Sequence, residues 1–448
     1  MEIKKIKEAA YGAVDRIKDY IEGIGEVIYG IPESGFKEFN TSELVKREFN
    51  KMGLKCITLD NIPGVKATID TGKEGPGIAV IGELDGVICS QHKDSNVETG
   101  VVHACGHNIM IADMLGVAKA IIESKVYDEL VGKIHFIAAP AEEYLEMDFR
   151  SELMEKGIIK YPTGKAELIH RGIFDDVEIC VMIHALSGRH KVILESGSNG
   201  FIAKKVKYIG KASHAASAPD KGVNALYAAN IGLMAINSIR ETFKEESALR
   251  VHPMITKGGD AVNVIPSEVT LETFVRGSNI HDVVEANYKV NRAFVGGAVA
   301  IGAKVEIEDT PGMFPLVVDE KLRNVAKEVG VELVGEDEVT MNPPSKGSTD
   351  LGDVSSIMPA LETCIGCISG GLHSPDYNVR NKDTAYVTGT KFLTGMVIEL
   401  LSNNSEKAKE IIEEYKPVFN DKQEYFEYAD KLFLKDIYPK CDCMTEIK

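Results

Sequence analysis

Apolar residues follow two different patterns along the chain, and the pattern changes near Gly197. Apolar side chains at helical spacing predict helices at residues 3–28, 41–53 and 111–124. Short continuous apolar runs predict buried strands at residues 77–81, 133–139 and 177–184. Strands that alternate with helices are typical of an α/β layer around a mostly parallel sheet. For the second helix we expect Thr41 or Ser42 as the N-cap and Gly53 just past its end.

Beyond Gly197 the chain predicts the element order β-α-β-β-α-β, which is that of a ferredoxin-like unit. The expected strands are 201–209, 249–256, 269–275 and 303–307, and the expected helices are 224–243 and 280–295. After Pro311 the α/β pattern returns, so the unit is inserted into the first domain. We therefore expect an α/β domain at 1–196 and 311–402, an inserted α+β domain at 197–310 and a C-terminal helical extension at 403–448.

Length and charge narrow the classes of protein that fit. A chain of 448 residues exceeds what one hydrophobic core usually serves. The net charge of −17 argues against nucleic-acid binding, since phosphate backbones require a basic face. No apolar run approaches the 18 residues of a membrane span, and the charged N-terminus lacks the pattern of a signal peptide. Eight cysteines are too few for a disulfide scaffold, so we expect a cytoplasmic protein.

The densest cluster of reactive side chains is the segment Val102-His-Ala-Cys-Gly-His-Asn108. A thiolate and an imidazole are good ligands for zinc or a similar divalent ion, and Gly106 allows a tight turn between Cys105 and His107. The alternative is a buried structural cysteine beside a hydrogen-bonded histidine.

A pair of carboxylates changes that balance. Glu142 and Glu143 follow the buried strand 133–139, at the carboxyl edge of the sheet, where α/β proteins place their sites. Adjacent buried carboxylates require a positive partner. A metal ion would satisfy one of them and leave the other as a proton shuttle; the alternative is an exposed turn. His184 and His373 also follow apolar runs.

At this point the chain resembles the M20 family of metal-dependent amidohydrolases and peptidases, in the branch of aminoacylases, aminobenzoyl-glutamate hydrolases and dipeptidase-like relatives. The matching segments run in family order and are Glu83-Leu-Asp85, His103-Ala-Cys-Gly-His-Asn108, Glu142-Glu143, His184, Ser213-His214, Gly222-Val-Asn-Ala225, Asn263-Val-Ile-Pro266, Gly347-Ser-Thr-Asp350 and His373. The resemblance implies a metallohydrolase domain with a mostly parallel sheet and an inserted ferredoxin-like lid or dimerisation domain.

The resemblance also implies roles for single residues. The metal ligands of a site for two divalent ions (zinc, manganese, cobalt or nickel) would be Cys105, His107, Glu143, His184 and His373. Glu142 would be the general base and acid that activates a metal-bridged water, and Asp85 would orient a ligand. His214 would contact the substrate, and in dimeric relatives this histidine reaches the partner subunit's site. Asn263 and Arg276 are further candidates for substrate contacts.

The implied reaction is hydrolysis of an amide bond in an N-acyl amino acid, an aminobenzoyl-glutamate-like compound or a dipeptide, by a homodimer or a higher homo-oligomer. The chain departs from the pattern of this family in two places: it lacks a second histidine shortly after Asn108, and its segment 86–102 is unusual. The chain lacks the G-x-S-x-G motif of serine hydrolases and the H-E-x-x-H motif of single-zinc proteases. Cys364 and Cys367 are expected to be buried core thiols rather than a redox pair. The remaining alternative is a metal-binding or regulatory protein without turnover.

Overall fold

The computed structural model describes residues 2–440, which divide into two compact units. The larger unit comprises residues 2–197, 316–345 and 349–420, and the smaller unit comprises residues 198–315, 346–348 and 421–440. The chain leaves the larger unit after Gly197 and returns to it at Leu316, and two shorter stretches, 346–348 and 421–440, also belong to the smaller unit.

The larger unit is built on a mixed sheet whose centre is parallel. Its strands, in spatial order, are β1 (Cys56–Thr58), β2 (Val65–Asp70), β6 (Lys133–Ala139), β3 (Gly77–Glu83), β7 (Ile179–Ser187), β17 (Ala360–Ser369), β8 (Val192–Leu194) and β16 (Val339–Met341), with β18 (Asn378–Val379) also paired to β17. The four central strands β6, β3, β7 and β17 are parallel to one another. Every residue of β3 is buried, which explains its continuous apolar run.

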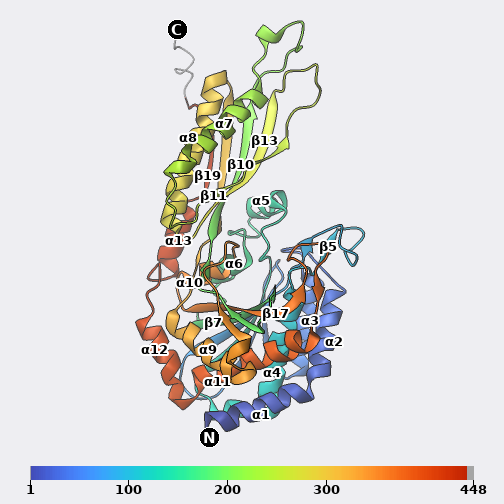
Figure 1. Cartoon of the computed structure of the whole chain (residues 1–448), viewed down its shortest axis with the longest axis vertical. Helices are drawn as coiled ribbons and strands as arrows, with labels where there is room; N and C mark the ends of the chain where they lie inside the picture. Colours follow the sequence, from blue (N-terminus) through green and yellow to red (C-terminus); the bar gives the residue numbers. More distant parts are fainter. Residues whose placement is uncertain (1, 441–448) are drawn as a thin grey trace. The chain divides into compact units, whose positions relative to one another are not determined.

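Helices cover both faces of this sheet (Figure 1). On one face lie α4 (His107–Ser124) and α11 (Gly389–Leu401), with α1 (Ile3–Arg16) packed against both. The other face carries α6 (Gly164–His170) on β6 and α10 (Leu351–Ser355) on β17. Among the described residues, the remaining α-helices of this unit are α2 (Lys18–Tyr29), α3 (Phe39–Lys51), α5 (Met147–Glu155), α9 (Glu320–Val334) and α12 (Glu406–Glu414).

Two helix boundaries differ from the sequence prediction. The helix expected at 3–28 is two helices, because Ile17 has a non-helical backbone (φ −101°, ψ 11°). Apolar positions continue across this break, so their spacing does not reveal it. The helix expected to begin at Thr41 or Ser42 begins at Phe39 instead. The backbone and the hydroxyl of Thr41 both donate to Glu33 Oε2, and Gly53 follows the helix with φ +80°.

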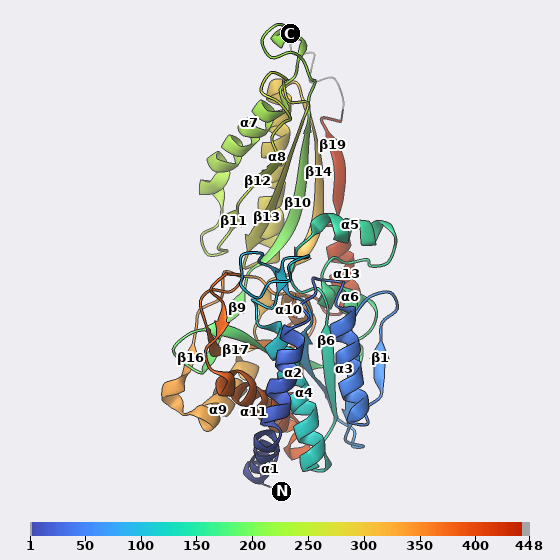
Figure 2. The same ribbon diagram turned by 90° about the vertical axis from the view of Figure 1, so that its right-hand side faces the viewer.

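The smaller unit has the predicted ferredoxin-like topology, with two helices on one face of an antiparallel sheet (Figure 2). Its strands are β10 (Gly200–Ile209), β11 (Arg250–Val251), β12 (Met254–Lys257), β13 (Glu268–Gly277) and β14 (Lys304–Met313), and its helices are α7 (Ala225–Ile239) and α8 (Ile280–Ile301). The sheet order is β11-β13-β10-β14, with β12 also paired to β13. The predicted fold class, an α/β domain interrupted by a ferredoxin-like domain, is therefore confirmed.

The sequence predicted a helical extension at residues 403–448, but the described part of this segment contains a strand as well as helices. The helix α12 belongs to the larger unit, whereas α13 (Lys422–Asp430) and the strand β19 (Leu434–Tyr438) belong to the smaller one. β19 pairs antiparallel with β14, from Val305↔Tyr438 to Asp309↔Leu434. Residues 441–448 lie outside the described part of the chain.

The segment 86–102 is an ordered loop closed by a short hairpin. β4 (Val87–Ile88) and β5 (Val101–Val102) pair antiparallel at its base. Within it, the buried ring of His92 places Nε2 3.0 Å from the carbonyl oxygen of Tyr377. The loop is thereby tied to the segment that follows His373. The other short strands are β9 (Gly197–Ser198) and β15 (Leu316–Val317), and no helix within residues 2–440 has the length and apolar character that crossing a bilayer requires.

Candidate metal centre and active site

The carboxyl ends of the central strands carry most of the predicted site residues. Asp85 lies just beyond β3, Glu142 and Glu143 lie just beyond β6, and His184 lies near the end of β7. His373 follows β17, which is parallel to β7. Because parallel strands end at the same edge of a sheet, residues from four separate parts of the sequence meet there.

Cys105 is at the centre of this cluster. Its Sγ lies 3.3 Å from Nε2 of His184 and 3.3 Å from Nε2 of His373. Nε2 of His373 in turn lies 2.7 Å from Oε1 of Glu143. Two groups of potential ligands share the thiol, namely Cys105–His107–His184 and Cys105–Glu143–His373, and within each group the ligating atoms lie within 4.8 Å of one another. The thiol of Cys105 therefore joins two adjacent groups that could each hold a cation.

Asp85 contacts one residue of each ligand group, namely His107 and Glu143. Nδ1 of His107 lies 2.8 Å from the carbonyl oxygen of Asp85, which leaves Nε2 as the nitrogen available to a metal. One carboxylate oxygen of Asp85 accepts a hydrogen bond from the backbone of Glu143 at 2.9 Å. The other lies 3.3 Å from Nδ1 of His107. A single fully buried carboxylate thus orients one residue of each group.

Two backbone features allow these side chains to converge. Gly106 has φ +90°, and a Cβ at this position would lie only 2.5 Å from Cβ of Ala185. Glycine is therefore required between Cys105 and His107. His373 has φ +56°, unusual for a residue with a side chain, and its N–H donates to the carbonyl oxygen of Ala104 at 2.9 Å.

Burial and the crowding of carboxylates shift the pKa values of the cluster in different directions. Burial, together with Glu143 and Glu142, raises the pKa of the Cys105 thiol well above its ordinary value. Burial alone would lower the pKa of His107, but Glu83, Asp85 and Glu143 raise it to about 10. Burial lowers the pKa of His184 to about 4. The pKa of the Glu142 carboxyl is raised, first by burial and then by Glu83 and Glu143.

The donor set fits divalent cations. Nε2 of His107 and Oε2 of Glu83 lie 3.1 Å apart, and Oε1 of Glu143 lies 2.7 Å from Nε2 of His373, yet within the described residues none of these three buried atoms has a hydrogen bond of good geometry. Several carboxylates and a thiol at one place repel one another unless positive charge is bound between them. Thiolate, imidazole and carboxylate together are ligands for zinc and similar transition-metal ions.

The structure adds a buried ion cluster that the sequence does not predict. Oε2 of Glu83 lies 3.1 Å from Nε2 of His107, and Glu83, His107 and Glu142 form a third group of potential ligands. The other oxygen of Glu83 pairs with the fully buried Lys165, which also pairs with Asp350. Glu83 stands at a strand end and had a recognisable signal, whereas Lys165 lies in a sequence typical of an exposed helix.

The three predicted substrate residues lie in the smaller unit. His214 forms an isolated β-bridge with Val264, and the N–H of Ala215 donates to the carbonyl oxygen of Asn263 at 2.9 Å, so the loops of His214 and Asn263 are neighbours. Arg276 is not with them, because it lies near the other end of β13, about 25 Å along an extended strand. Its guanidinium stacks on Phe201 and Phe274, at 5.2 and 5.1 Å from the ring centroids.

Other candidate residues lie outside the two ligand groups. His103 is fully buried, neither ring nitrogen makes a hydrogen bond within the described residues, and burial lowers its pKa to about 3. Cys364 and Cys367 are buried free thiols of β17, which matches the expectation of core cysteines. Cys364 also forms a ligand-like group with Glu195 and Glu362, but burial raises the pKa of Glu362 to about 8, so its carboxyl is protonated at neutral pH.

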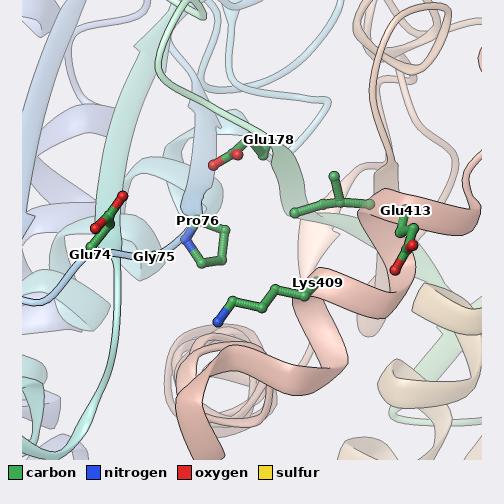
Figure 3. Close-up of a pocket in the computed structure, with 7 residues that line it drawn as sticks. Glu74, Gly75, Pro76, Glu178, Lys409 and Glu413 are labelled. Atoms are coloured by element: carbon green, nitrogen blue, oxygen red, sulfur yellow. The ribbon is translucent and has the colours of Figure 1, made fainter.

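A separate cavity of about 580 Å³ lies where β3 and β7 begin, at the opposite edge of the sheet (Figure 3). Its walls include Glu74, Pro76, Glu178 and Lys409. None of the predicted site residues lines it. The cluster around Cys105 therefore remains the candidate active site.

Comparison with known proteins agrees with this location. The sequence profile of peptidase family M20/M25/M40 matches residues 79–399, which is most of the chain and includes all the predicted ligands. The chain therefore belongs to peptidase family M20/M25/M40, a family of hydrolases, and the resemblance found from its motifs is confirmed.

Individual relatives share only part of their length and about a third or less of their aligned residues with this chain. The chain is 33% identical to the mouse (Mus musculus) Xaa-Arg dipeptidase over 268 residues, covering 58% of this chain and 56% of the relative. It is 28% identical to one of the chains of the p-aminobenzoyl-glutamate hydrolase of Escherichia coli over 258 residues, 54% of each chain. The matches thus span about half the length of these curated relatives.

Among solved structures, the fold is similar to that of Bacillus subtilis YXEP, described as a dinuclear metal binding peptidase of the M20 family. The TM-score is 0.67 at 18% sequence identity, covering 86% of this chain and 99% of that one.

Proposed function

We propose that this protein is a two-metal hydrolase of amide bonds in dipeptides or N-acyl amino acids. The observation that carries the proposal is the convergence of two ligand groups on the single thiol of Cys105, with the Glu142 carboxyl beside them. Names of relatives such as Xaa-Arg dipeptidase and p-aminobenzoyl-glutamate hydrolase support this reaction class.

The ligands of the two ions would be Cys105, His107 and His184 for one and Cys105, Glu143 and His373 for the other. Zinc, manganese, cobalt and nickel all suit this donor set. When bound, two such ions lower the pKa of a water molecule and polarise the amide carbonyl.

The chain's own residues would handle protons and substrate. Glu142 would take the proton of the attacking water and deliver it to the leaving nitrogen. Asp85 would hold His107 and the backbone of Glu143 in place through the contacts described above. His214 would donate a hydrogen bond to the developing oxyanion, with Asn263 as its neighbour in substrate binding.

The surroundings of Arg276 favour a substrate with a free carboxylate. Its guanidinium is half-buried, burial lowers its pKa, and within residues 2–440 it forms no ion pair. A guanidinium in such a place favours a carboxylate through paired hydrogen bonds. We therefore propose that the leaving amine is an amino acid. We propose that His214 contacts the substrate bound by a second copy of the chain. The proposed assembly is therefore a homodimer, and the sedimentation coefficient of the purified protein tests it.

The test combines a substrate panel with a variant. Purified protein loaded with zinc, manganese or cobalt is assayed on N-acyl amino acids, aminobenzoyl-glutamate and Lys- or Arg-containing dipeptides, each with and without its terminal carboxylate. Glu142→Gln should keep its metal content and lose at least roughly 10²-fold in kcat, because the general base is gone. Glu152→Gln, on the exposed side of α5, is the matched control and should behave as wild type.

Two outcomes would contradict the proposal. Glu142→Gln with more than about a tenth of wild-type activity would remove its role as the general base. Metal-loaded wild-type protein that hydrolyses no member of the panel would favour the alternative of a metal-binding or regulatory protein.

A further inference from the structure

The loop that carries Glu142 and Glu143 is held in an unusual conformation. It connects β6 to α5, and within it Ala141 and Glu146 have left-handed backbones, with φ of +54° and +52°. Neither is glycine, so neither adopts this conformation without support from its surroundings. The conformation of this loop decides where both carboxylates point.

Arg150 provides much of that support. Its side chain is 1% exposed, and its guanidinium donates to four main-chain carbonyl oxygens. Three of these belong to the loop: Nε donates to Leu145 at 2.7 Å, Nη1 to Ala141 at 3.4 Å and Nη2 to Glu143. The fourth, on Pro162, ties the loop to the segment before α6.

The packing around Arg150 fixes the guanidinium itself. Phe36 and Tyr144 lie against it, each with a ring centroid 5.3 Å from Cζ. Gly35 leaves room for it, since a Cβ at that position would lie 2.6 Å from Nη2. Within residues 2–440 no carboxylate forms an ion pair with it at 4.0 Å or less, so its donors serve the main chain. A planar guanidinium with five N–H donors suits several fixed carbonyls at once, and an ammonium group does not.

Two buried carboxylates hold the amide groups of the same loop. Oε1 of Glu38, which is fully buried, accepts from the N–H of Ala141 at 2.7 Å. Oδ2 of Asp85 accepts from the N–H of Glu143 at 2.9 Å. The backbone on either side of Glu142 is therefore bonded through both its carbonyl and its amide groups.

We propose that Arg150 is a positioning residue that clamps the loop 140–146, directing Glu143 toward Cys105 and His373 and Glu142 toward the substrate. The assignment deepens the proposed function and rests on it for the role of Glu142. Glu143 belongs to only one of the two ligand groups, and no residue of the loop belongs to the group Cys105–His107–His184. Loosening the clamp should therefore weaken the binding of the ion held by Cys105, Glu143 and His373 and leave the binding of the other ion unchanged.

The experiment compares Arg150→Lys and Arg150→Met with the control Arg171→Met. Arg171 is half-buried and donates to two main-chain carbonyls, of Asp60 and Ile158, neither of which belongs to this loop. Zinc titration against a competing chelator should show two tight equivalents in wild type and in the control. Arg150→Lys should keep one and bind the second about 10- to 100-fold more weakly. Its kcat should fall while KM changes little.

Hydrogen exchange supplies a readout that does not depend on metal or turnover. In Arg150→Lys the amides of Ala141 and Glu143 should exchange at least about tenfold faster, while those of β3 keep their wild-type rates. If Arg150→Met does not fold, Arg150→Lys decides. Unchanged exchange and two unchanged zinc equivalents in Arg150→Lys would overturn the clamp. A wild-type protein that binds zinc but hydrolyses nothing would instead overturn the proposed function and leave the clamp standing.

Discussion

At the scale of single residues, the thiol of Cys105 decides whether the site can hold two ions, because both ligand groups depend on it. In the metal-free protein at neutral pH, burial and the carboxylates of Glu143 and Glu142 keep its pKa high, so it is protonated. His107 carries a proton as well, since its pKa is about 10. His184, with a pKa of about 4, is already neutral.

Metal loading should therefore release protons. An ion bound by Cys105, His107 and His184 at pH 7 should displace about two protons, and its affinity should rise as the pH rises toward 10, the pKa of His107. Calorimetric titration in buffers of different ionisation enthalpy measures this number. Cys105→Ser should no longer release the proton of the thiol, and it should bind both ions weakly. Cys180→Ser, at another fully buried thiol, is the control and should release as many protons as wild type. Heats that do not depend on the buffer would contradict the proton count.

At the scale of secondary-structure elements, Lys165 joins three parts of the larger unit. It lies in the first turn of α6, and its ammonium group pairs with Glu83 at the end of β3 and with Asp350 ahead of α10. Its backbone N–H also donates to Asp350 at 2.8 Å. All three side chains are 1% exposed or less. The ion cluster thus fixes the layer of α6 and α10 against the strand end next to His107.

Removing the cation should destabilise the fold. Lys165→Met leaves the buried carboxylate of Asp350 without an ion-pair partner and leaves Glu83 with His107 alone, which costs roughly 3–5 kcal/mol of unfolding free energy at pH 7.5. The loss should shrink at pH 5, because buried carboxyls without a cation have raised pKa values and take up protons as the pH falls; even beside Lys165, burial raises the pKa of Asp350 to about 6. Denaturant unfolding at both pH values measures it.

The matched control is Lys156→Met, which removes an exposed ion pair with Glu152 on α5 and should cost less than about 1 kcal/mol. A loss in Lys165→Met as small as that of the control would mean that the buried cluster contributes little to stability.

At the scale of the whole molecule, residues 434–438 complete the sheet of the smaller unit. The strand β19 covers the edge of β14, so an edge that would otherwise present free N–H and C=O groups is paired. This strand is far in sequence from its partner and is short, with alternating exposed and half-buried residues. Its sequence therefore gave no strong strand signal beside the charged, aromatic-rich residues around it.

Truncation after Asp430 should uncover β14. The amides of residues 305–309 should exchange faster, the smaller unit should melt at a lower temperature, and the free edge should promote self-association. Truncation after Lys440 keeps β19 and removes only residues outside the described structure, so it is the control. Exchange rates and sedimentation that match between the two truncations would show that β19 does not protect this edge.

The parallel core and most of the candidate ligands could be predicted from sequence because their signals are local. A continuous apolar run such as 133–139 predicts a buried strand whatever lies next to it, and the residues that follow such runs, Glu142 and His184 among them, then fall at one edge of a parallel sheet. The order of apolar runs likewise predicted the ferredoxin-like insertion. Helix boundaries were less well predicted, since apolar spacing continues through the break at Ile17.

The sequence by itself therefore determined the fold class, the family and the chemistry gathered at the strand ends. Only the tertiary structure decided which charged residues are buried and what each one holds. Arg150 and Lys165 lie in charged stretches typical of solvent-exposed helices, yet both are buried, because carbonyls or carboxylates brought in from other parts of the fold satisfy them. A buried charge is stable only beside its partners, and those partners are adjacent in space rather than in sequence.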